Sequence, residues 1–203
     1  MATSRRSRAV HDSAAYLLHA TAWRETSLVI QVLSREHGCV AMVAKGAKRP
    51  YSVLRPVLSA FQPLALSWSG AGEVKNLTRA DVSGIRALTG AALMSGWYMN
   101  ELLLRFLPRE DPHPFLYDAY DEALVRLGAG DRAAAALRRF EWALLRESGY
   151  GLSGPQPDFD DLEGEPALRK LLREKLAEQL AGRPLSTRRV LMEFQSRFID
   201  RQS

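Results

Sequence analysis

Residues 27–46, "SLVIQVLSREHGCVAMVAKG", contain two apolar runs separated by a short polar segment. Residues 27–34 are rich in Val and Ile, which is typical of a strand with both faces partly covered. Residues 35–38 predict a turn, because Gly38 can adopt a positive φ angle without steric cost. Residues 39–46 are apolar again, so the whole stretch predicts a β-hairpin.

Strand signals continue on both sides of this hairpin. Residues 15–20 form a short apolar segment, and residues 63–69 and 73–82 flank a tight "GAG" connection. Five short strands then fall within about 70 residues. A closed five-stranded barrel of OB type is the economical arrangement, because closure leaves no exposed sheet edge.

The pattern changes to helical periodicity after Leu88. Helices are predicted over residues 89–108, 114–127, 133–148 and 167–182, and a shorter one begins near Ser186. A run of strands followed by a run of helices predicts an α+β protein with segregated domains. The predicted organisation is a flexible basic tail (1–13), an OB-fold DNA-binding domain (14–83) and a helical domain (84–203) with an acidic linker (153–166).

Positive charge is concentrated in the N-terminal part of the chain. Residues 1–80 contain 11 Lys and Arg but 4 Asp and Glu, a net charge of +7. The remaining 123 residues contain 17 Lys and Arg and 19 Asp and Glu, a net charge of −2. This asymmetry favours nucleic acid or another polyanion as the partner, although Arg-rich proteins can be basic without binding one.

The composition argues against several other classes of protein. The single cysteine, Cys39, excludes an internal disulfide and a Cys-rich zinc module. With no signal-peptide pattern and no long apolar run, we expect a cytoplasmic protein without a membrane segment. The four histidines lack metal-ligand spacing, and the two "GAG" turns are too short to bind phosphate. We therefore expect no catalytic residue, metal, cofactor or small-molecule substrate.

The cations of the predicted barrel are the candidate contacts to nucleic acid. They are Arg24, Lys45, Lys48, Arg49, Arg55, Lys75 and Arg79. Lys75 and Arg79 are four residues apart on a strand, which predicts side chains on the same face. Glu73 is the only acid between residues 45 and 79, so most of these cations are expected to lack an ion-pair partner. Unpaired cations on one small barrel indicate a surface for phosphates.

Aromatic residues are interleaved with these cations. OB-fold proteins that bind single strands combine a basic groove with aromatic rings on which bases stack. Phe61 and Trp68 fit this role but fit the barrel core better. Tyr51 follows Pro50 in a polar loop and is the better stacking candidate.

Motifs along nearly the whole chain resemble the RecO family of bacterial recombination mediators. The matching stretches are "WRETSLVIQVLSREHG" (23–38), "VAKGAKRP" (43–50), "FQPLALSWSGAGEVKNLTRAD" (61–81), "GWYMNELLLRFLPREDPHP" (96–114), "ALRRFEWALLRESGYGL" (136–152) and "LRKLLREKLAEQLAGRPLSTRRVL" (168–191). The resemblance implies an OB domain, a helical domain and no enzymatic turnover.

The resemblance also implies partners. Such proteins bind single- and double-stranded DNA, anneal complementary strands and are associated with the bacterial nucleoid. With RecR they load the RecA recombinase onto strands coated by the single-strand-binding protein (SSB), and they dock the acidic C-terminal tail of SSB. A protein-protein adaptor that uses its OB fold without touching DNA is the alternative.

Arg138 and Arg139 are the candidate contacts for the SSB tail. They lie beside the apolar face of the helix predicted over residues 133–148, and an acidic peptide with an apolar end needs a cation beside an apolar surface. The alternative is that both arginines are solvated.

The chain departs from the family pattern between the "YG" signal and the last helices. Relatives usually carry a longer insertion there, and some hold zinc with four cysteines. Here the region is the short acidic linker 153–166 without cysteine, so zinc is not expected.

Overall fold

The hairpin predicted over residues 27–46 is present in the computed structural model of the chain, which describes residues 9–150, 152, 154–181 and 185–187. Strands β2 (Ser27–Ser34) and β3 (Gly38–Ala44) pair antiparallel, with Leu28 opposite Ala44. Gly38 adopts a φ of 68°, as predicted for the turn residue.

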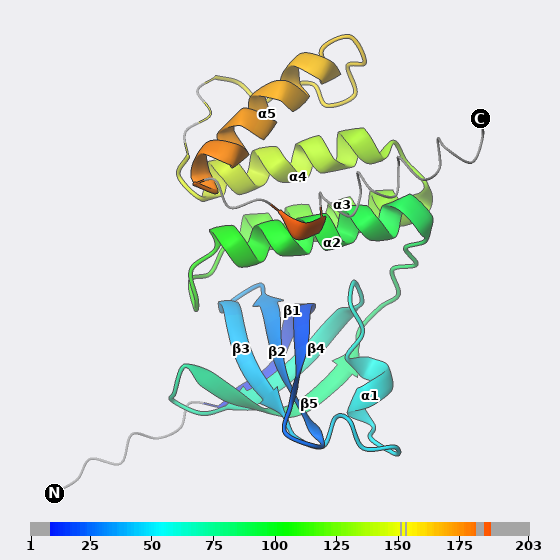
Figure 1. Cartoon of the computed structure of the whole chain (residues 1–203), viewed down its shortest axis with the longest axis vertical. Helices are drawn as coiled ribbons and strands as arrows, with labels where there is room; N and C mark the ends of the chain where they lie inside the picture. Colours follow the sequence, from blue (N-terminus) through cyan, green and yellow to red (C-terminus); the bar gives the residue numbers. More distant parts are fainter. Residues whose placement is uncertain (1–8, 151, 153, 182–184, 188–203) are drawn as a thin grey trace, which may run out of the picture. The chain divides into compact units, whose positions relative to one another are not determined.

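The remaining strands close a barrel around this hairpin (Figure 1). They are β1 (Val10–Trp23), β4 (Pro63–Ser69) and β5 (Val74–Val82). The strand order is β1-β2-β3-β5-β4, and all neighbours are antiparallel except the parallel pair β3 and β5. The predicted fold class, a five-stranded OB-type barrel followed by helices, is confirmed.

Strand β1 is much longer than the segment 15–20 that its apolar residues predicted. Its first part pairs with β4 and its second part with β2, so one strand serves two neighbours. The pairing register shifts between Val10 and Ser13 and again between Leu17 and His19. Each irregularity changes which residues face inward, so no single alternation runs along the strand.

The barrel interior holds a packed apolar core. Its largest members include Ile30, Met42, Leu66 and Trp68, all 3% exposed or less. Trp68 and Phe61 are both 3% exposed, which confirms that they are core residues. Burying a large apolar side chain of this kind contributes roughly 1.5–3 kcal/mol.

A short helix, α1 (Leu54–Val57), lies between β3 and β4. The sequence did not predict it, because four residues are too few to show helical periodicity. Leu54 and Val57 pack against the barrel core, as does Leu58, which follows the helix. This packing fixes the basic segment that leads into α1.

The described chain divides into two compact units. One comprises the residues up to Arg86 together with Leu107–Tyr117, and the other comprises Ala87–Phe106 and the residues from Asp118 onward. Within the barrel unit, the backbone N–H of Glu110 donates to the carbonyl of Cys39 at 3.0 Å. Residues 107–117 therefore accompany the barrel, although the expected helical domain began at residue 84.

The four helices predicted after the barrel are all present. They are α2 (Gly90–Phe106), α3 (Pro114–Ala129), α4 (Ala133–Glu147) and α5 (Glu165–Gln179). α4 packs against α2 and α5 (Figure 1). Phe140 and Leu144 of α4 are fully buried, and the hydroxyl of Tyr120 donates to Asn100 Oδ1.

Glu101 of α2 receives the start of the helical turn predicted near Ser186. Its carboxylate accepts the backbone N–H groups of Ser186 and Thr187, both at 2.9 Å, and the Thr187 hydroxyl at 2.7 Å. Burial raises the pKa of this carboxyl, but the three hydrogen bonds and Arg105 outweigh it, so the pKa is lowered overall. The rest of the predicted helix lies outside the described residues.

Two features are absent from the described residues. None of the helices found there is both long and apolar enough to cross a membrane. The same residues contain no group of three or more His, Cys, Asp or Glu side chains arranged to hold a metal ion.

Candidate nucleic-acid interface

Five of the predicted cations lie on two connections of the barrel. Arg24 is in the turn between β1 and β2, and the others lie between β3 and the end of α1. The backbone N–H of Lys48 donates to the carbonyl of Thr26 at 2.9 Å, which ties the two connections together. We call this set of exposed cations the basic rim, defined as Arg24, Lys45, Lys48, Arg49 and Arg55.

The backbone of the basic rim is ordered by a chain of turns. Gly46 takes a φ of 72°, and its carbonyl accepts the N–H of Arg49 at 3.0 Å. Ser52 donates to the Arg49 carbonyl at 3.1 Å, and Arg55 donates to Ser52 at 3.3 Å. Ala47 is 1% exposed and belongs to the barrel core, so its packing holds the segment against the barrel. The cations are thus presented by a preorganised loop.

The charges of the basic rim are not neutralised by ion pairs within the described part of the chain. None of its five members forms a salt bridge with a described carboxylate. Glu25 directly follows Arg24 in the sequence without pairing with it. The rim can therefore offer its charge to an external anion without first breaking an ion pair with a described carboxylate.

Lys75 and Arg79 are differently placed from the rim. Lys75 Nζ lies 2.8 Å from Glu110 Oε1 and donates to the Gly72 carbonyl at 2.8 Å, and its side chain is 11% exposed. Arg79 Nε lies 2.7 Å from Asp81 Oδ2 on the same strand. Both cations have intramolecular partners, and the partner of Lys75 comes from the segment that follows α2.

The expectation that Lys75 and Arg79 share a face is wrong. The register of β4 with β5 shifts between Ser67 and Trp68, which face Arg79 and Leu77 respectively. The extra residue, Thr78, reverses the alternation of side chains along β5. Lys75 therefore has the inward orientation of Leu77, whereas Arg79 is 66% exposed.

Two aromatic rings accompany the basic rim. Tyr51 is 99% exposed, so its ring is accessible to a base, and its role as a stacking residue stays a prediction. Trp23 is 48% exposed, and its ring centroid lies 6.0 Å from the Arg24 guanidinium carbon. Sequence reasoning did not assign Trp23 a role, although its place beside Arg24 in a turn was a usable signal.

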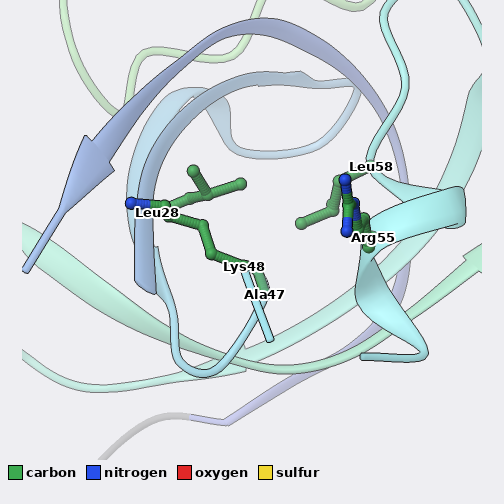
Figure 2. A pocket seen from close by; sticks show the side chains of 5 residues that line it. All are labelled: Leu28, Ala47, Lys48, Arg55 and Leu58. Atoms are coloured by element: carbon green, nitrogen blue, oxygen red, sulfur yellow. The ribbon is translucent and has the colours of Figure 1, made fainter. Parts of the chain in front are cut away.

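A pocket of about 260 Å³ opens among the residues of the rim (Figure 2). It is lined by Leu28, Ala47, Lys48, Arg55 and Leu58. Leu28 comes from β2, while the others come from the connection that contains α1. Sequence reasoning identified the two cations but missed the three apolar residues, which look like ordinary core positions in the sequence.

Arg138 is buried in the helical unit rather than exposed. It is 8% exposed, and its Nη2 donates to Glu141 Oε1 at 3.0 Å. The hydroxyl of Tyr98 donates to the same oxygen at 2.8 Å. Burial raises the pKa of the Glu141 carboxyl, while Arg138 and Tyr98 act against that rise. The alternative of a solvated Arg138 is therefore wrong.

Arg139 is covered by the acidic linker of its own chain. Its Nη2 pairs with Asp160 Oδ2, and its guanidinium carbon lies 5.2 Å from the ring centroid of Phe159. Phe159 is 3% exposed and also contacts the ring of Trp142, with centroids 6.4 Å apart. Residues 158–161 thus place an acidic and aromatic segment on this arginine.

The five-stranded barrel followed by a helical unit defines a protein of segregated β and α domains with an OB-type barrel. Two family models match the chain: Recombination protein O N terminal over residues 9–86 and Recombination protein O C terminal over residues 88–155. The chain belongs to the recombination protein O (RecO) family.

Relatives from several bacteria support the same assignment. The chain is 44% identical over 232 residues to DNA repair protein RecO of Aromatoleum aromaticum, covering 92% of this chain and 97% of the relative. It is 40% identical to the protein of that name from an Azoarcus species, covering 91% of this chain and 96% of the relative. A third, from Cupriavidus metallidurans, is 56% identical over 148 residues, which are 72% of this chain and 50% of the relative.

The first of these alignments is longer than the chain itself. It extends over 232 residues, whereas the chain has 203. The Aromatoleum protein therefore has residues without a counterpart in this chain.

Proposed function

We propose that this chain is a non-enzymatic DNA-binding recombination mediator. It binds single- and double-stranded DNA, promotes annealing and, with RecR, loads RecA on SSB-coated strands during recombinational repair. Membership of the RecO family and relatives named for DNA repair support the general role. The basic rim is the observation that supports DNA binding, because its five exposed cations form no ion pair with a carboxylate among the described residues.

The rim acts on the phosphate backbone. Five phosphate contacts predict a slope of log K against log salt near −3.5 for a single strand, because each contact contributes about −0.7. Such contacts position a strand without reading its sequence. Annealing then follows from charge, because a cationic surface reduces the repulsion between two complementary strands and raises their local concentration.

A salt titration separates this proposal from the adaptor alternative. Fluorescence anisotropy of a labelled oligonucleotide is measured at several salt concentrations. We expect tight binding at low salt and roughly a hundredfold loss between 50 and 200 mM. Absence of binding at low salt would favour the OB-fold adaptor and overturn the DNA-binding proposal.

The SSB tail remains the proposed partner of the helical unit. Arg139 has suitable chemistry, since it already holds a carboxylate and an aromatic ring of its own chain. A tail peptide would have to displace residues 158–161 to reach it. Arg138 supports the site from within through its ion pair with Glu141 rather than by touching the peptide.

A labelled tail peptide tests this site directly. We expect Arg139→Ala to weaken peptide binding. Arg138→Ala is expected to weaken it together with a loss of thermal stability, because it leaves Glu141 buried without its cation. Unchanged peptide affinity in a folded Arg139→Ala variant would remove the assignment without touching the DNA-binding proposal.

A further inference from the structure

The pocket of the basic rim combines two chemistries that phosphate binding does not require. Its cations are Lys48 and Arg55, and the rest of its lining is aliphatic, from Leu28, Ala47 and Leu58. Figure 2 shows the side chains of Leu28 and Leu58 pointing toward each other, with Lys48 on one side and Arg55 on the other. A phosphate alone would use the cations and leave the aliphatic walls without a ligand.

We propose that this pocket takes one unstacked nucleobase of a single DNA strand. The base lies between the aliphatic walls, while Lys48 and Arg55 contact the phosphates on either side of it. This inference rests on the proposed DNA-binding function and deepens it. It gives the rim a contact that favours single-stranded over duplex DNA, in addition to the contacts made by its charges.

The size of the pocket fits this ligand. At about 260 Å³ it is slightly smaller than the range of roughly 300–1,000 Å³ typical of sites for drug-sized ligands. One planar base fits that space, whereas several stacked bases do not. The walls are also fixed in advance, because Ala47 is buried in the core and Leu28 and Leu58 pack against it.

The pocket accepts a base from single-stranded DNA more readily than one from a duplex. A base in a duplex is paired and stacked, so it has to leave the helix before it can enter a pocket, at a cost of a few kcal/mol. A base in a flexible single strand avoids most of that cost. The cations of the rim serve both forms of DNA, whereas the pocket favours the single strand.

Tyr51 makes a separate contact. Its ring is almost fully exposed and is not among the residues that line the pocket. A base stacked on Tyr51 and a base held in the pocket are therefore distinct contributions. Any test of the pocket has to separate the two.

The experiment compares a labelled oligothymidylate with an oligonucleotide of equal length whose nucleosides are replaced by abasic tetrahydrofuran units. Both carry the same phosphates. Anisotropy titrations at several salt concentrations should give equal slopes for the two. We expect the abasic strand to bind about 5- to 30-fold more weakly. The part of this preference that comes from the pocket should remain in the Tyr51→Ala variant.

Two substitutions locate the effect. Leu58→Asn keeps the side-chain size but puts an amide in the pocket, and we expect it to remove most of the preference that remains in Tyr51→Ala. Val53→Asn is the matched control, because Val53 lies on the same segment, is 79% exposed and does not line the pocket. It should leave the preference unchanged. If Leu58→Asn fails to fold, the oligonucleotide comparison is made in Trp23→Ala/Tyr51→Ala, which removes both exposed rings of the rim and leaves the pocket as the source of any remaining preference.

The outcomes separate the pocket from the proposed function. Equal affinity for intact and abasic strands in Tyr51→Ala would overturn the pocket and leave phosphate binding intact. No binding of either strand at low salt would overturn DNA binding and the pocket together. A free deoxynucleoside monophosphate that competes as well as the intact strand would make the pocket a free-nucleotide site and overturn the proposal.

Discussion

Removing three cations of the basic rim should change the salt dependence of DNA binding by a predictable amount. Lys45, Lys48 and Arg49 are exposed and form no ion pair with a described carboxylate, so each can release counterions from a bound strand. Each contact contributes about −0.7 to the slope for single strands. The Lys45→Ala/Lys48→Ala/Arg49→Ala variant should therefore shift the slope from about −3.5 to about −1.4.

The loss of affinity also follows from the number of phosphate contacts removed. With 1 M salt as the reference, each contact is worth about fivefold at 0.1 M, so three contacts are worth roughly a hundredfold. Anisotropy with a labelled single strand between 0.05 and 0.3 M salt measures both quantities. Circular dichroism and thermal unfolding should be unchanged, because these side chains are exposed and the loop backbone remains hydrogen-bonded.

Lys75→Ala/Arg79→Ala is the matched control for charge. Both cations are engaged, with Glu110 and Asp81 respectively. We expect this pair to change the slope by much less than the rim triple. A slope that stays near −3.5 in the triple variant would show that these rim cations do not contact phosphates. So would a control that changes the slope as much per charge as the rim variant does.

Three further predictions concern stability and reactivity. Gly38→Ala should cost about 3 kcal/mol of folding stability in a denaturant titration, because its φ is positive and the new Cβ meets the backbone of the segment that follows α2. Gly46→Ala has equal φ strain but no backbone clash, so it should cost about 1–2 kcal/mol in the same titration. Burial raises the pKa of the Cys39 thiol to about 12, so at pH 8 its thiolate should be roughly a thousandfold scarcer than that of an ordinary thiol; labelling by a disulfide reagent should be slow in the folded protein and fast in denaturant. Phe159→Ala should lower the stability of the helical unit by about 3 kcal/mol and strengthen binding of an SSB tail peptide by uncovering its arginine, while Leu162→Ala, at a 69% exposed position, should change neither.

The barrel could be predicted from the sequence where local patterns control it. The β-branched run in β2 and the turn at Gly38 specify the hairpin without help from distant residues. α1 escaped prediction because a four-residue helix containing Pro56 has no periodicity to detect. The full length of β1 escaped because two register shifts interrupt its alternation.

The candidate site was predictable only for residues whose surroundings are local. The rim cations between residues 45 and 55 follow directly from a basic loop that contains no acid. The ion pair of Lys75 with Glu110 joins residues distant in sequence, so a search for nearby acids could not find it. Arg138 gave a usable signal that was missed: it is three residues before Glu141 and seven before Leu145, which puts all three on one buried stripe of α4.

The two chemistries of the basic rim predict a preference between strand and duplex that depends on salt. Five phosphate contacts give slopes near −3.5 for single strands and near −4.5 for duplex DNA. The ratio of strand affinity to duplex affinity should then rise about fourfold as salt increases from 50 to 200 mM.

The proposed base pocket adds a contribution to this ratio that does not depend on salt, because burial of a base between aliphatic walls releases no counterions. Leu58→Asn should therefore lower the ratio by a constant factor at every salt concentration, whereas loss of Lys45 should lessen its rise with salt. When two strands anneal on this surface, their bases pair and the pocket contact is lost. The protein therefore binds the duplex product more weakly than the two single strands that formed it. If the ratio is independent of salt in the unsubstituted protein, then phosphate contacts on the rim do not control binding.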